Sequence, residues 1–491
     1  MFSTSFFPAW RHQLGPMRSS TSPGHKLRGA TLAQIENQLA PAFPSQLLAK
    51  ADTHDYSRER IFPLFRTFWC WTWQILQANT SCREVVRQVQ AQFALEGGGV
   101  VNEATGGYCQ AREKVPLSSL EKIFVATANS VEHKAQACPA LQGRALKVLD
   151  GSSTRLVDTS SNRQAYPPPK SVKQGCGFPV MKLVVLFSLA SGALLARATG
   201  TQSMHEVRLC EALRAFFLEG DIVVADRAYA LFPVLAWLQT LKVDIIARVP
   251  TRLRRVDFRK AKKRLGPGEA LFQWTKSCKV CAFLPLEEWL GISSEITVRI
   301  LRVNLRSAGF RTQHLTLVTT LLDPTLYPPE EIIAAYARRW RLEMCLDDLK
   351  TSLNMEHLHC HSAAMVEKEL LVFLIAHNLL RWLMLEAAQN HSVNLEQISF
   401  KGTMDAFRQF AIALCQIARR QSKRRTQLWN EFLQALAADR VPKRPGRKEP
   451  RAVKKRSKYP HLNTPRKLFR DKLSRNQQRV RASARKRALL N

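Results

Sequence analysis

Acidic residues are scarce in this chain of 491 residues: 39 Asp and Glu stand against 74 Lys and Arg, a formal net charge of +35 at pH 7. So basic a chain repels itself unless a polyanion is near, which favours nucleic acid over a membrane surface or an acidic metabolite as partner. The excess is uneven, because residues 441–491 hold 19 Lys and Arg against Glu449 and Asp471. Hydrophobic residues make up 45% of the chain, enough for the cores of two or three domains, so it is not a disordered polycation.

Secretion signals and a cysteine framework are also missing. Residues 1–16 lack the basic start, apolar core and small-residue cleavage site of a signal peptide, and the 11 cysteines are scattered. We therefore expect a cytoplasmic protein, in a reducing compartment where disulfides do not persist. Cys278 and Cys281 form one CxxC without a second pair, and a zinc site would need them to meet the His357–His361 segment about 75 residues away. This alternative is weak, and a β-hairpin pair of cysteines is the simpler interpretation.

Long apolar runs without interruption are absent as well. Residues 180–196 are broken by Lys182 and a SLASGA turn, and residues 370–388 contain three polar residues at mid-length, namely His377, Asn378 and Arg381. A charge in the middle of a bilayer costs a few kcal/mol, so we predict both runs as buried elements of a protein without a membrane partner.

The periodicity changes several times along the chain, and no internal repeat is present. Residues up to about 140 read as helical, with a tryptophan-rich core segment and a capping box at Ser81 and Glu84. From Ala145 short apolar runs alternate with helical patterns, among them a helix expected over 204–220, which predicts an α/β fold with a mixed sheet. The predicted parts are a helical N-terminal domain, the first part of the sheet domain, a β-rich insertion, the rest of the sheet domain, a helical segment and a basic tail (residues 1–140, 141–250, 251–327, 328–400, 401–440 and 441–491).

Two aspartates follow apolar runs. Asp150 ends KVLD and Asp226 ends IVVAD, so each is predicted at the C-terminal end of a strand, where α/β sheets commonly place their sites. A lone aspartate at such a place is more often a cap or turn residue. Asp158 and Asp221 lie near them, but Asp221 precedes its strand, where a turn role is expected, and Asp158 follows a short polar segment.

A third acid lies on the helix that begins at YPPEEIIAAY. At about 100° per residue, the helix places four polar residues within an arc of roughly 60°, namely Tyr336, Arg339, Glu343 and Lys350. A solvated face with an Arg339–Glu343 pair would explain this row too, and Asp347 lies close enough to Glu343 to replace it by spacing alone.

Three carboxylates meeting in so basic a protein would repel one another unless a divalent cation lay between them. Oxygen ligands select Mg²⁺ or Mn²⁺. Two such ions activate the attacking oxygen and stabilise the leaving oxygen in phosphodiester cleavage. Arg339 and Lys350 would then hold the flanking phosphates.

These residues resemble the DDE transposases of bacterial insertion sequences, in the insertion-sequence-4 group with its Tyr-Arg-Glu-Lys signature. Every interval of that signature is met by Tyr336, Arg339, Glu343 and Lys350, while LDGSSTRLVDTSSN and GDIVVADRAY resemble the blocks of the two aspartates. The likeness extends from about residue 82 into the basic tail.

The resemblance implies an RNase H-like α/β fold with a β-rich insertion before the glutamate helix. It implies metal-dependent cleavage at transposon ends and joining of the 3′-OH ends to target DNA, by a homodimer or larger synaptic assembly. By the same carry-over Asp150, Asp226 and Glu343 bind two Mg²⁺ or Mn²⁺ ions, and the residues expected to contact DNA are Tyr336, Arg339, Lys350 and Arg227. The alternatives are an RNase H-like nuclease without strand transfer and a non-catalytic DNA-binding protein.

Overall fold

The computed structural model describes residues 61–95, 98–135, 140–168, 172–250, 256–304, 314–417, 421–441 and 462–468. Its first helices are α3 (Leu64–Leu76), α4 (Cys82–Leu95), α5 (Gly106–Lys114) and α6 (Leu117–Lys134). Trp69 and Trp71 of α3 are buried, and the hydroxyl of Ser81 accepts a hydrogen bond of 3.2 Å from the backbone N–H of Glu84, as the capping box predicts. The N-terminal domain assigned to residues 1–140 stays a prediction, and its residues 1–60 lie outside the described residues.

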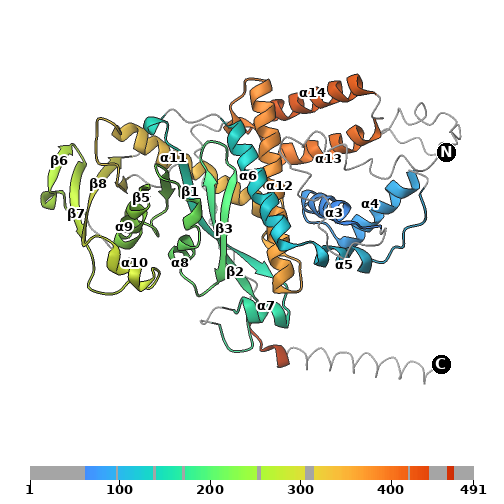
Figure 1. Cartoon of the computed structure of the whole chain (residues 1–491), viewed down its shortest axis with the longest axis horizontal. Coiled ribbons are helices and arrows are strands. Elements are labelled where there is room, and N and C mark those ends of the chain that lie inside the picture. Colours follow the sequence, from blue (N-terminus) through green and yellow to red (C-terminus); the bar gives the residue numbers. More distant parts are fainter. Residues whose placement is uncertain are drawn as a thin grey trace, which may run out of the picture.

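One mixed sheet forms the centre of the molecule (Figure 1). Its strands are β1 (Leu146–Leu156), β2 (Val180–Ser188), β3 (Leu194–Thr201), β4 (Ile222–Ala225), β5 (Asp244–Arg248), β6 (Lys263–Gly266), β7 (Glu269–Thr275), β8 (Glu295–Asn304), β9 (His314–Thr319) and β10 (His357–Leu358). They lie side by side in the order β3-β2-β1-β4-β5-β9-β8-β7-β6, and β10 pairs with the end of β1. Strands β1, β4 and β5 are parallel, and β2 and β3 run as an antiparallel meander beside β1. This is the RNase H-like arrangement that the resemblance implies.

The β-rich stretch predicted at residues 251–327 contains β6 to β9 and the short helix α10 (Leu286–Gly291). Strand β9 pairs antiparallel with β5, so these strands extend the same sheet. Arg299 of β8 is fully buried and donates to Glu269 at 2.6 Å and to the carbonyl of Tyr327 at 2.8 Å. The extension is thereby held to the segment that leads into the next helix, α11 (Pro329–Asp347).

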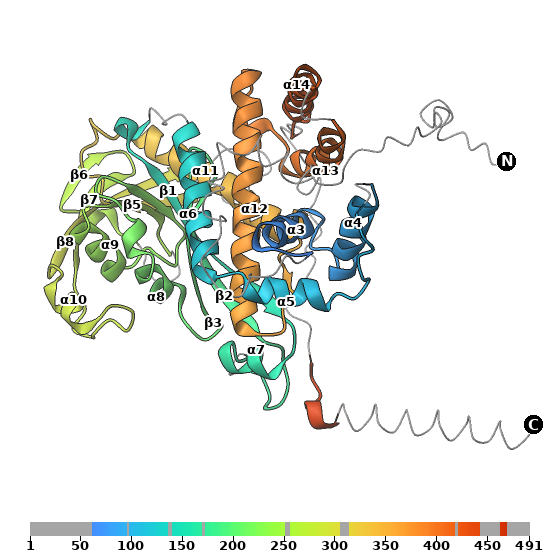
Figure 2. The same ribbon diagram turned by 45° about the vertical axis from the view of Figure 1, so that its right-hand side comes forward.

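Helices cover both faces of the sheet. Helices α8 (Glu206–Glu211) and α9 (Phe232–Thr240) pack on one face, and α6, α11 and α12 (Ala363–Asn390) share a core with the other. Helix α12 lies beside α6 and stands between the sheet and a group of helices formed by α3, α4, α5, α13 (Phe400–Gln416) and α14 (Ser422–Ala438) (Figures 1 and 2). The sheet therefore has a helical layer on each side, with a further helical layer outside α12.

Helix α12 is long and apolar enough to cross a membrane, and 89% of its apolar window is buried inside the protein. Its polar residues bind the turn between β2 and β3. The side chain of Asn378 bonds to both the N–H and the carbonyl of Leu194, at 2.9 and 3.0 Å, and Arg381 donates to the carbonyl of Ser191 at 2.8 Å. Gly192 has a φ of +70°, and a Cβ there would collide with the Arg381 guanidinium, so this turn needs glycine for two reasons.

The helix expected over 204–220 is shorter than predicted. Helix α8 ends at Glu211, and a 3₁₀ turn follows at Arg214–Phe216. Lys147 of β1 donates to the carbonyl of Phe216 at 2.8 Å, which draws this segment toward the start of β4 instead of letting the helix continue. Leu213 and Phe217, which the apolar periodicity predicts to face the core, are both buried although they lie beyond the end of the helix.

The basic tail predicted at residues 441–491 falls mostly outside the described residues. Its described piece, residues 462–468, lies near α7 (Ser160–Ala165) and away from α13 and α14 (Figure 1). The N–H of Gly177 donates to the carbonyl of Leu462 at 3.2 Å, and the N–H of Arg466 donates to Gly175 at 3.2 Å. A segment nearly 300 residues later in the chain is therefore held to the loop between β1 and β2.

Candidate active site

The two strand aspartates occupy aligned positions on neighbouring strands. The parallel pairing of β1 and β4 runs to Leu149 and Ala225, and the next residue on each strand is Asp150 and Asp226. Neighbouring strands lie about 4.8 Å apart, so the two carboxylates start from adjacent backbone positions. Although 76 residues separate them in sequence, the pairing of the strands makes their backbones neighbours in space.

Asp150 does not end its strand, which corrects the sequence-based expectation. Strand β1 continues to Leu156, because residues beyond Asp150 pair with β2 on one side and β10 on the other. What ends at Leu149 is the pairing with β4. Asp226 does follow the last residue of β4, as predicted.

Each aspartate has one carboxylate oxygen bound by the local backbone. Asp150 Oδ1 accepts from the N–H of Gly151 at 2.9 Å, and Asp226 Oδ1 accepts from the N–H of Ala228 at 2.7 Å. Both residues are half-buried. These bonds restrict the rotation of both carboxylates.

Helix α11, which bears Glu343, packs against β1, β4 and β5. Its first turn is anchored by Glu331, whose Oε2 accepts from the N–H of Leu141 at 2.5 Å. Glu343 lies in the last two turns of α11; its side chain is outside the described atoms. The helix thus approaches the strand of each aspartate, as the predicted carboxylate site requires.

Tyr336 and Arg339 lie inside the protein, with 1% and 6% of their surface exposed. The Arg339 guanidinium lies 5.4 Å from the centre of the Tyr336 ring and bonds to its hydroxyl. Burial raises the pKa of Tyr336. The positive charges of Arg339 and Arg248 oppose that shift, and the negative charge of Asp226 adds to it. The tyrosine therefore lies near Asp226, and contact of Tyr336 or Arg339 with DNA stays a prediction.

Arg248 is a candidate that sequence reasoning missed. Strands β4 and β5 pair in parallel up to Ala225 and Ala247, so Arg248 is aligned with Asp226 on the next strand. It is half-buried and close enough to influence Tyr336. The signal was present in the sequence, because the apolar run at residues 245–247 is followed by the polar residue Arg248, as the runs before Asp150 and Asp226 are followed by an acid.

Lys350 does not share one regular α-helix with Glu343, which corrects the predicted 60° arc. Helix α11 ends at Asp347, and Asp348–Ser352 forms a π-helical turn with a wider hydrogen-bond spacing. The wider turn rotates Lys350 relative to its α-helical position. The leucines of this segment still face inward, since Leu349 and Leu353 are fully buried, which gives the π turn a packing reason.

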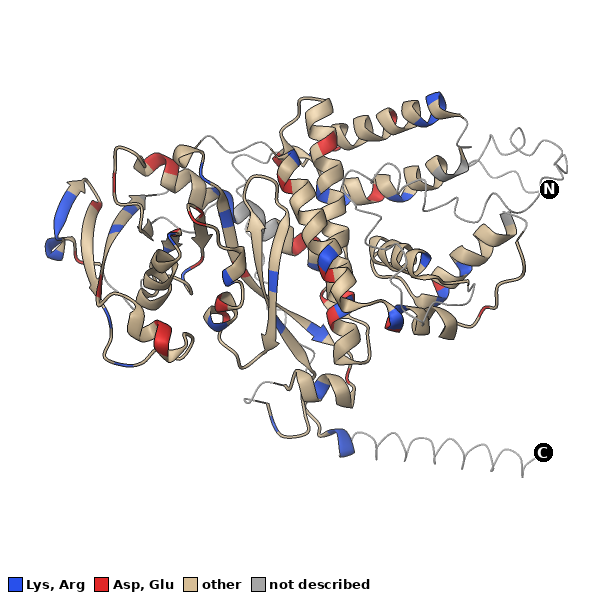
Figure 3. Cartoon of the chain, in the orientation of Figure 1, with Lys and Arg blue, Asp and Glu red and all other residues tan. Residues whose placement is uncertain are grey.

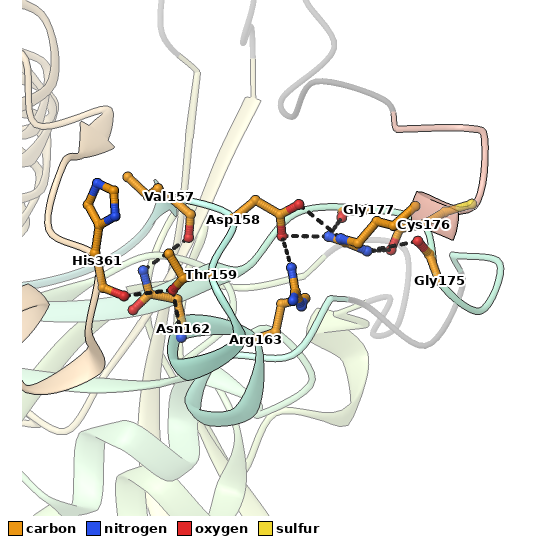
Figure 4. A network of polar contacts seen from close by, with 10 residues as sticks. Val157, Asp158, Thr159, Asn162, Arg163, Gly175, Cys176, Gly177 and His361 are labelled. Atoms are coloured by element: carbon orange, nitrogen blue, oxygen red, sulfur yellow. Dashed lines mark hydrogen bonds and ion pairs between the residues drawn. The ribbon is translucent and has the colours of Figure 1, made fainter. Parts of the chain in front are cut away.

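The rival aspartates have other partners. Asp158, at the start of the loop between β1 and β2, binds Arg163 at 2.8 Å and Arg466 at 2.7 Å (Figure 4). Asp221 is buried, accepts from the N–H of Leu218 at 2.6 Å and pairs with Lys147 at 2.5 Å, in agreement with the expected turn role. Asp347 is exposed and accepts from the hydroxyl of Thr351 at 3.1 Å.

The donors available to a metal ion are carboxylate oxygens, which suit Mg²⁺ or Mn²⁺. Within the described residues no three His, Cys, Asp or Glu side chains form a closed metal cluster, so the pair Asp150 and Asp226 needs a further ligand, and Glu343 is the predicted one. Cys278 of the CxxC is exposed between β7 and α10, whereas His357 pairs with Arg155 of β1. Asp150 and Asp226 therefore fit a magnesium site better than these cysteines and histidines fit a zinc site.

Basic residues are spread over the described fold, on strands and helices alike, rather than gathered on one element (Figure 3). Arg227, the weakest of the predicted DNA contacts, is exposed directly beside Asp226. Its position next to the carboxylates leaves it accessible to a strand of nucleic acid. Whether it contacts DNA stays a prediction.

Known proteins are similar to this chain. Residues 142–379 match the family described as the transposase DDE domain. Over 361 residues the chain is 25% identical to the transposase InsG for insertion sequence element IS4 of Escherichia coli (strain K12), covering 73% of this chain and 78% of that protein. The cryo-EM structure of a piggyBac transposase synaptic complex with hairpin DNA aligns with 81% of this chain and 85% of its own, at a TM-score of 0.39 and 9% identity. By these matches, residues 142–379 resemble a transposase DDE domain, and the chain as a whole is similar to the transposases of insertion sequences.

Proposed function

We propose that this transposase cuts DNA at the ends of its own element and joins the freed 3′-OH ends to target DNA. The observation that carries the proposal is the register of β1 and β4, which puts Asp150 and Asp226 at adjacent positions beside the helix that bears Glu343. Carboxylates at adjacent positions repel one another, and a divalent cation between them would offset that repulsion.

The proposed metal ligands are Asp150, Asp226 and Glu343, and the ions are two Mg²⁺ or Mn²⁺. When bound, such ions activate the attacking oxygen and stabilise the leaving oxygen of an in-line displacement. The carboxylate oxygens already bound to Gly151 and Ala228 keep both aspartates oriented before any ligand arrives. Reorganisation at the moment of reaction is thereby reduced.

The basic residues around this centre serve the nucleic acid in different ways. Arg227 is exposed and would bind a phosphate near the cleaved bond. Tyr336 and Arg339 form a buried pair beside Asp226. We propose that they contact only the part of the DNA that enters the carboxylate site. Lys350, after the π turn, would hold a flanking phosphate as a point charge.

The basic tail and the N-terminal helices complete the proposal. The tail would neutralise phosphates without reading sequence, so its contribution to binding should fall steeply with salt. The N-terminal domain would read the element's ends, and two copies of the chain would hold the two ends together in a synaptic assembly.

The direct test is incubation of the full chain with duplexes carrying the ends that flank its own gene and a supercoiled target, with Mg²⁺, Mn²⁺ or chelator. Cleavage at the element boundary and joined products are expected only with metal. Cleavage without joined products would favour the nuclease alternative.

Glu343→Gln should abolish cleavage and keep DNA binding, whereas the matched variant Asp347→Asn should cleave normally. The reverse pattern would exchange the two acids as third ligand. Full activity of Asp226→Asn would favour a DNA-binding protein that is not an enzyme.

A further inference from the structure

A fourth carboxylate, that of Glu206, lies against β1 directly beside the aspartate pair. A Cβ atom built on Gly151 would lie 2.6 Å from both the Cδ and the Oε2 atom of Glu206. Such a distance is far below van der Waals contact, so the carboxylate occupies the space that a side chain at residue 151 would fill. Gly151 follows Asp150 and binds its carboxylate through the backbone N–H. The Glu206 carboxylate therefore lies against the main chain of the residue that follows Asp150.

The position of Glu206 is fixed by the packing of α8 on β2 and β3. Val207, Leu209 and Cys210 of α8 are buried. The backbone of Gly200 on β3 approaches so closely that a Cβ there would lie 2.9 Å from the Leu209 side chain. Before the helix, Lys182 of β2 donates to the carbonyl of Met204 at 2.6 Å. These contacts hold the first residue of α8 at β1 without any contribution from its carboxylate.

A buried hydroxyl points to a missing ligand at the same place. Tyr229 follows Asp226 by three residues and is 1% exposed, and within the described residues its hydroxyl has no hydrogen-bond partner. Burial raises the pKa of Tyr229, and the charges of Cys210, Glu206, Asp226 and Asp150 raise it further. Buried hydroxyls are nearly always paired, and an ordered water or hydrated ion among these acids would supply the partner.

We propose that Glu206 is a further carboxylate of the metal site, which it reaches across Gly151 from the face of the sheet opposite to α11. The proposal rests on the proposed function, since it adds a ligand to the same ions. An ion such as Mg²⁺ takes six oxygen ligands, which three carboxylates leave incomplete. Because no three acids among the described residues are grouped so as to hold one ion directly, Glu206 reaches the ion through a water that Tyr229 also contacts.

An acid in the first turn of a helix is also favoured by the helix dipole, worth about 0.3–1 kcal/mol. That role predicts a change in stability alone. A role in the metal site predicts a change in metal affinity, so affinity is the quantity to measure.

The test is the affinity of the full chain for Mn²⁺ without DNA, followed by electron paramagnetic resonance. Glu206→Gln should weaken binding by about 10- to 100-fold, the range typical of residues that support a metal ligand. The control Glu211→Gln, at the other end of α8, should bind as the parent does. Parent-like affinity of Glu206→Gln together with lost affinity of Asp226→Asn would overturn this inference and leave the proposed function intact. Parent-like affinity of Asp226→Asn would overturn both.

A second variant covers the case in which Glu206→Gln fails to fold. Gly151→Ala leaves Glu206 in place but adds a methyl group where its carboxylate lies, and the flexible end of the glutamate gives way. We expect the same loss of Mn²⁺ affinity, with no further loss in the double variant, because both changes remove one interaction. Full additivity of the two losses would contradict the proposal.

Discussion

Two aspartates eight residues apart, Asp150 and Asp158, have opposite neighbours. Asp150 lies beside Asp226 on the adjacent strand and near Glu206 across Gly151. Asp158 is bound by the guanidinium groups of Arg163 and Arg466 (Figure 4). In the first region an acid lies beside another acid, whereas in the second the acid is bound by two arginines.

Other aspartates of the sheet resemble Asp158. Asp221 pairs with Lys147 at 2.5 Å, and Asp244 pairs with Arg144 at 2.7 Å. In a chain with 74 basic residues, pairing with Lys or Arg is the ordinary arrangement for an acid. An acid that meets another acid across a strand pair is the exception that carries functional information.

The largest expected effect on cleavage comes from neutralising one aspartate in each region. Asp150→Asn should reduce cleavage of end DNA by roughly 10³-fold or more, because a catalytic group that acts as part of a unit is lost. Asp158→Asn should leave cleavage within a few-fold of the parent, because its partners are arginines outside the carboxylate pair. Cleavage rates at saturating metal would measure both, and equal losses would remove the distinction between the regions.

The second effect concerns the docked C-terminal segment. Arg466 donates to both oxygens of Asp158 and to the carbonyls of Gly175, Cys176 and Gly177. Arg466→Ala should lower the free energy of local opening of this segment by about 1.5–3 kcal/mol, the worth of hydrogen bonds to a charged group. Hydrogen exchange of residues 172–177 would report it, and the exposed neighbour Lys467 supplies the control, Lys467→Ala. Unchanged protection in Arg466→Ala would mean that the backbone bonds alone hold the segment.

The third effect is a pH dependence of opposite sign at two aspartates. Burial opposes the shift at Asp158, but hydrogen bonds from Arg466 and Arg163 lower its pKa, so its stabilising contribution is present above about pH 4 and lost as the pH falls. Burial raises the pKa of Asp348 to about 7, with Arg381 opposing, so the folded state binds the proton more tightly there. Stability should therefore fall as the pH rises from about 4 to 7.

Asp348→Asn should remove that fall, which amounts to at most about 1.4 kcal/mol per pH unit. Thermal unfolding between pH 4 and 8 measures it, with Asp347→Asn as the exposed neighbour. A slope that persists in Asp348→Asn would assign it to another group.

The smallest effect concerns two thiols at α4 and α5. A hydrogen bond from Cys82 lowers the pKa of Cys109 to about 6, with burial opposing and Arg112 assisting. Alkylation of Cys109, followed by mass spectrometry, should rise with a midpoint near pH 6. Cys82→Ala should move the midpoint toward the ordinary thiol value of about 8.5. An unchanged midpoint would show that Arg112 alone sets the reactivity.

Several features followed from local pattern. The apolar runs that end in Asp150 and Asp226 are strands, the helix opened by two prolines is α11, and the run at residues 370–388 is buried in α12. These succeed because hydrophobic periodicity and caps act over a few residues. Where the local pattern predicted the wrong end of a strand or helix, a contact with a residue distant in sequence had moved that end. Strand β1 continues beyond Asp150 because β2 and β10 pair with its later residues. Helix α8 ends before its predicted end because Lys147 binds the carbonyl of Phe216.

The sequence by itself determined the charge, the segments and the spacing of the signature Tyr336, Arg339, Glu343 and Lys350, all of which are properties of residue type and order. The tertiary structure alone decided which acids meet. The strand register aligned Asp150 with Asp226, the packing of α8 brought Glu206 to Gly151, and the docked segment neutralised Asp158. Electrostatic energy depends on distance in space, and no local pattern encodes the pairing of strands 76 residues apart.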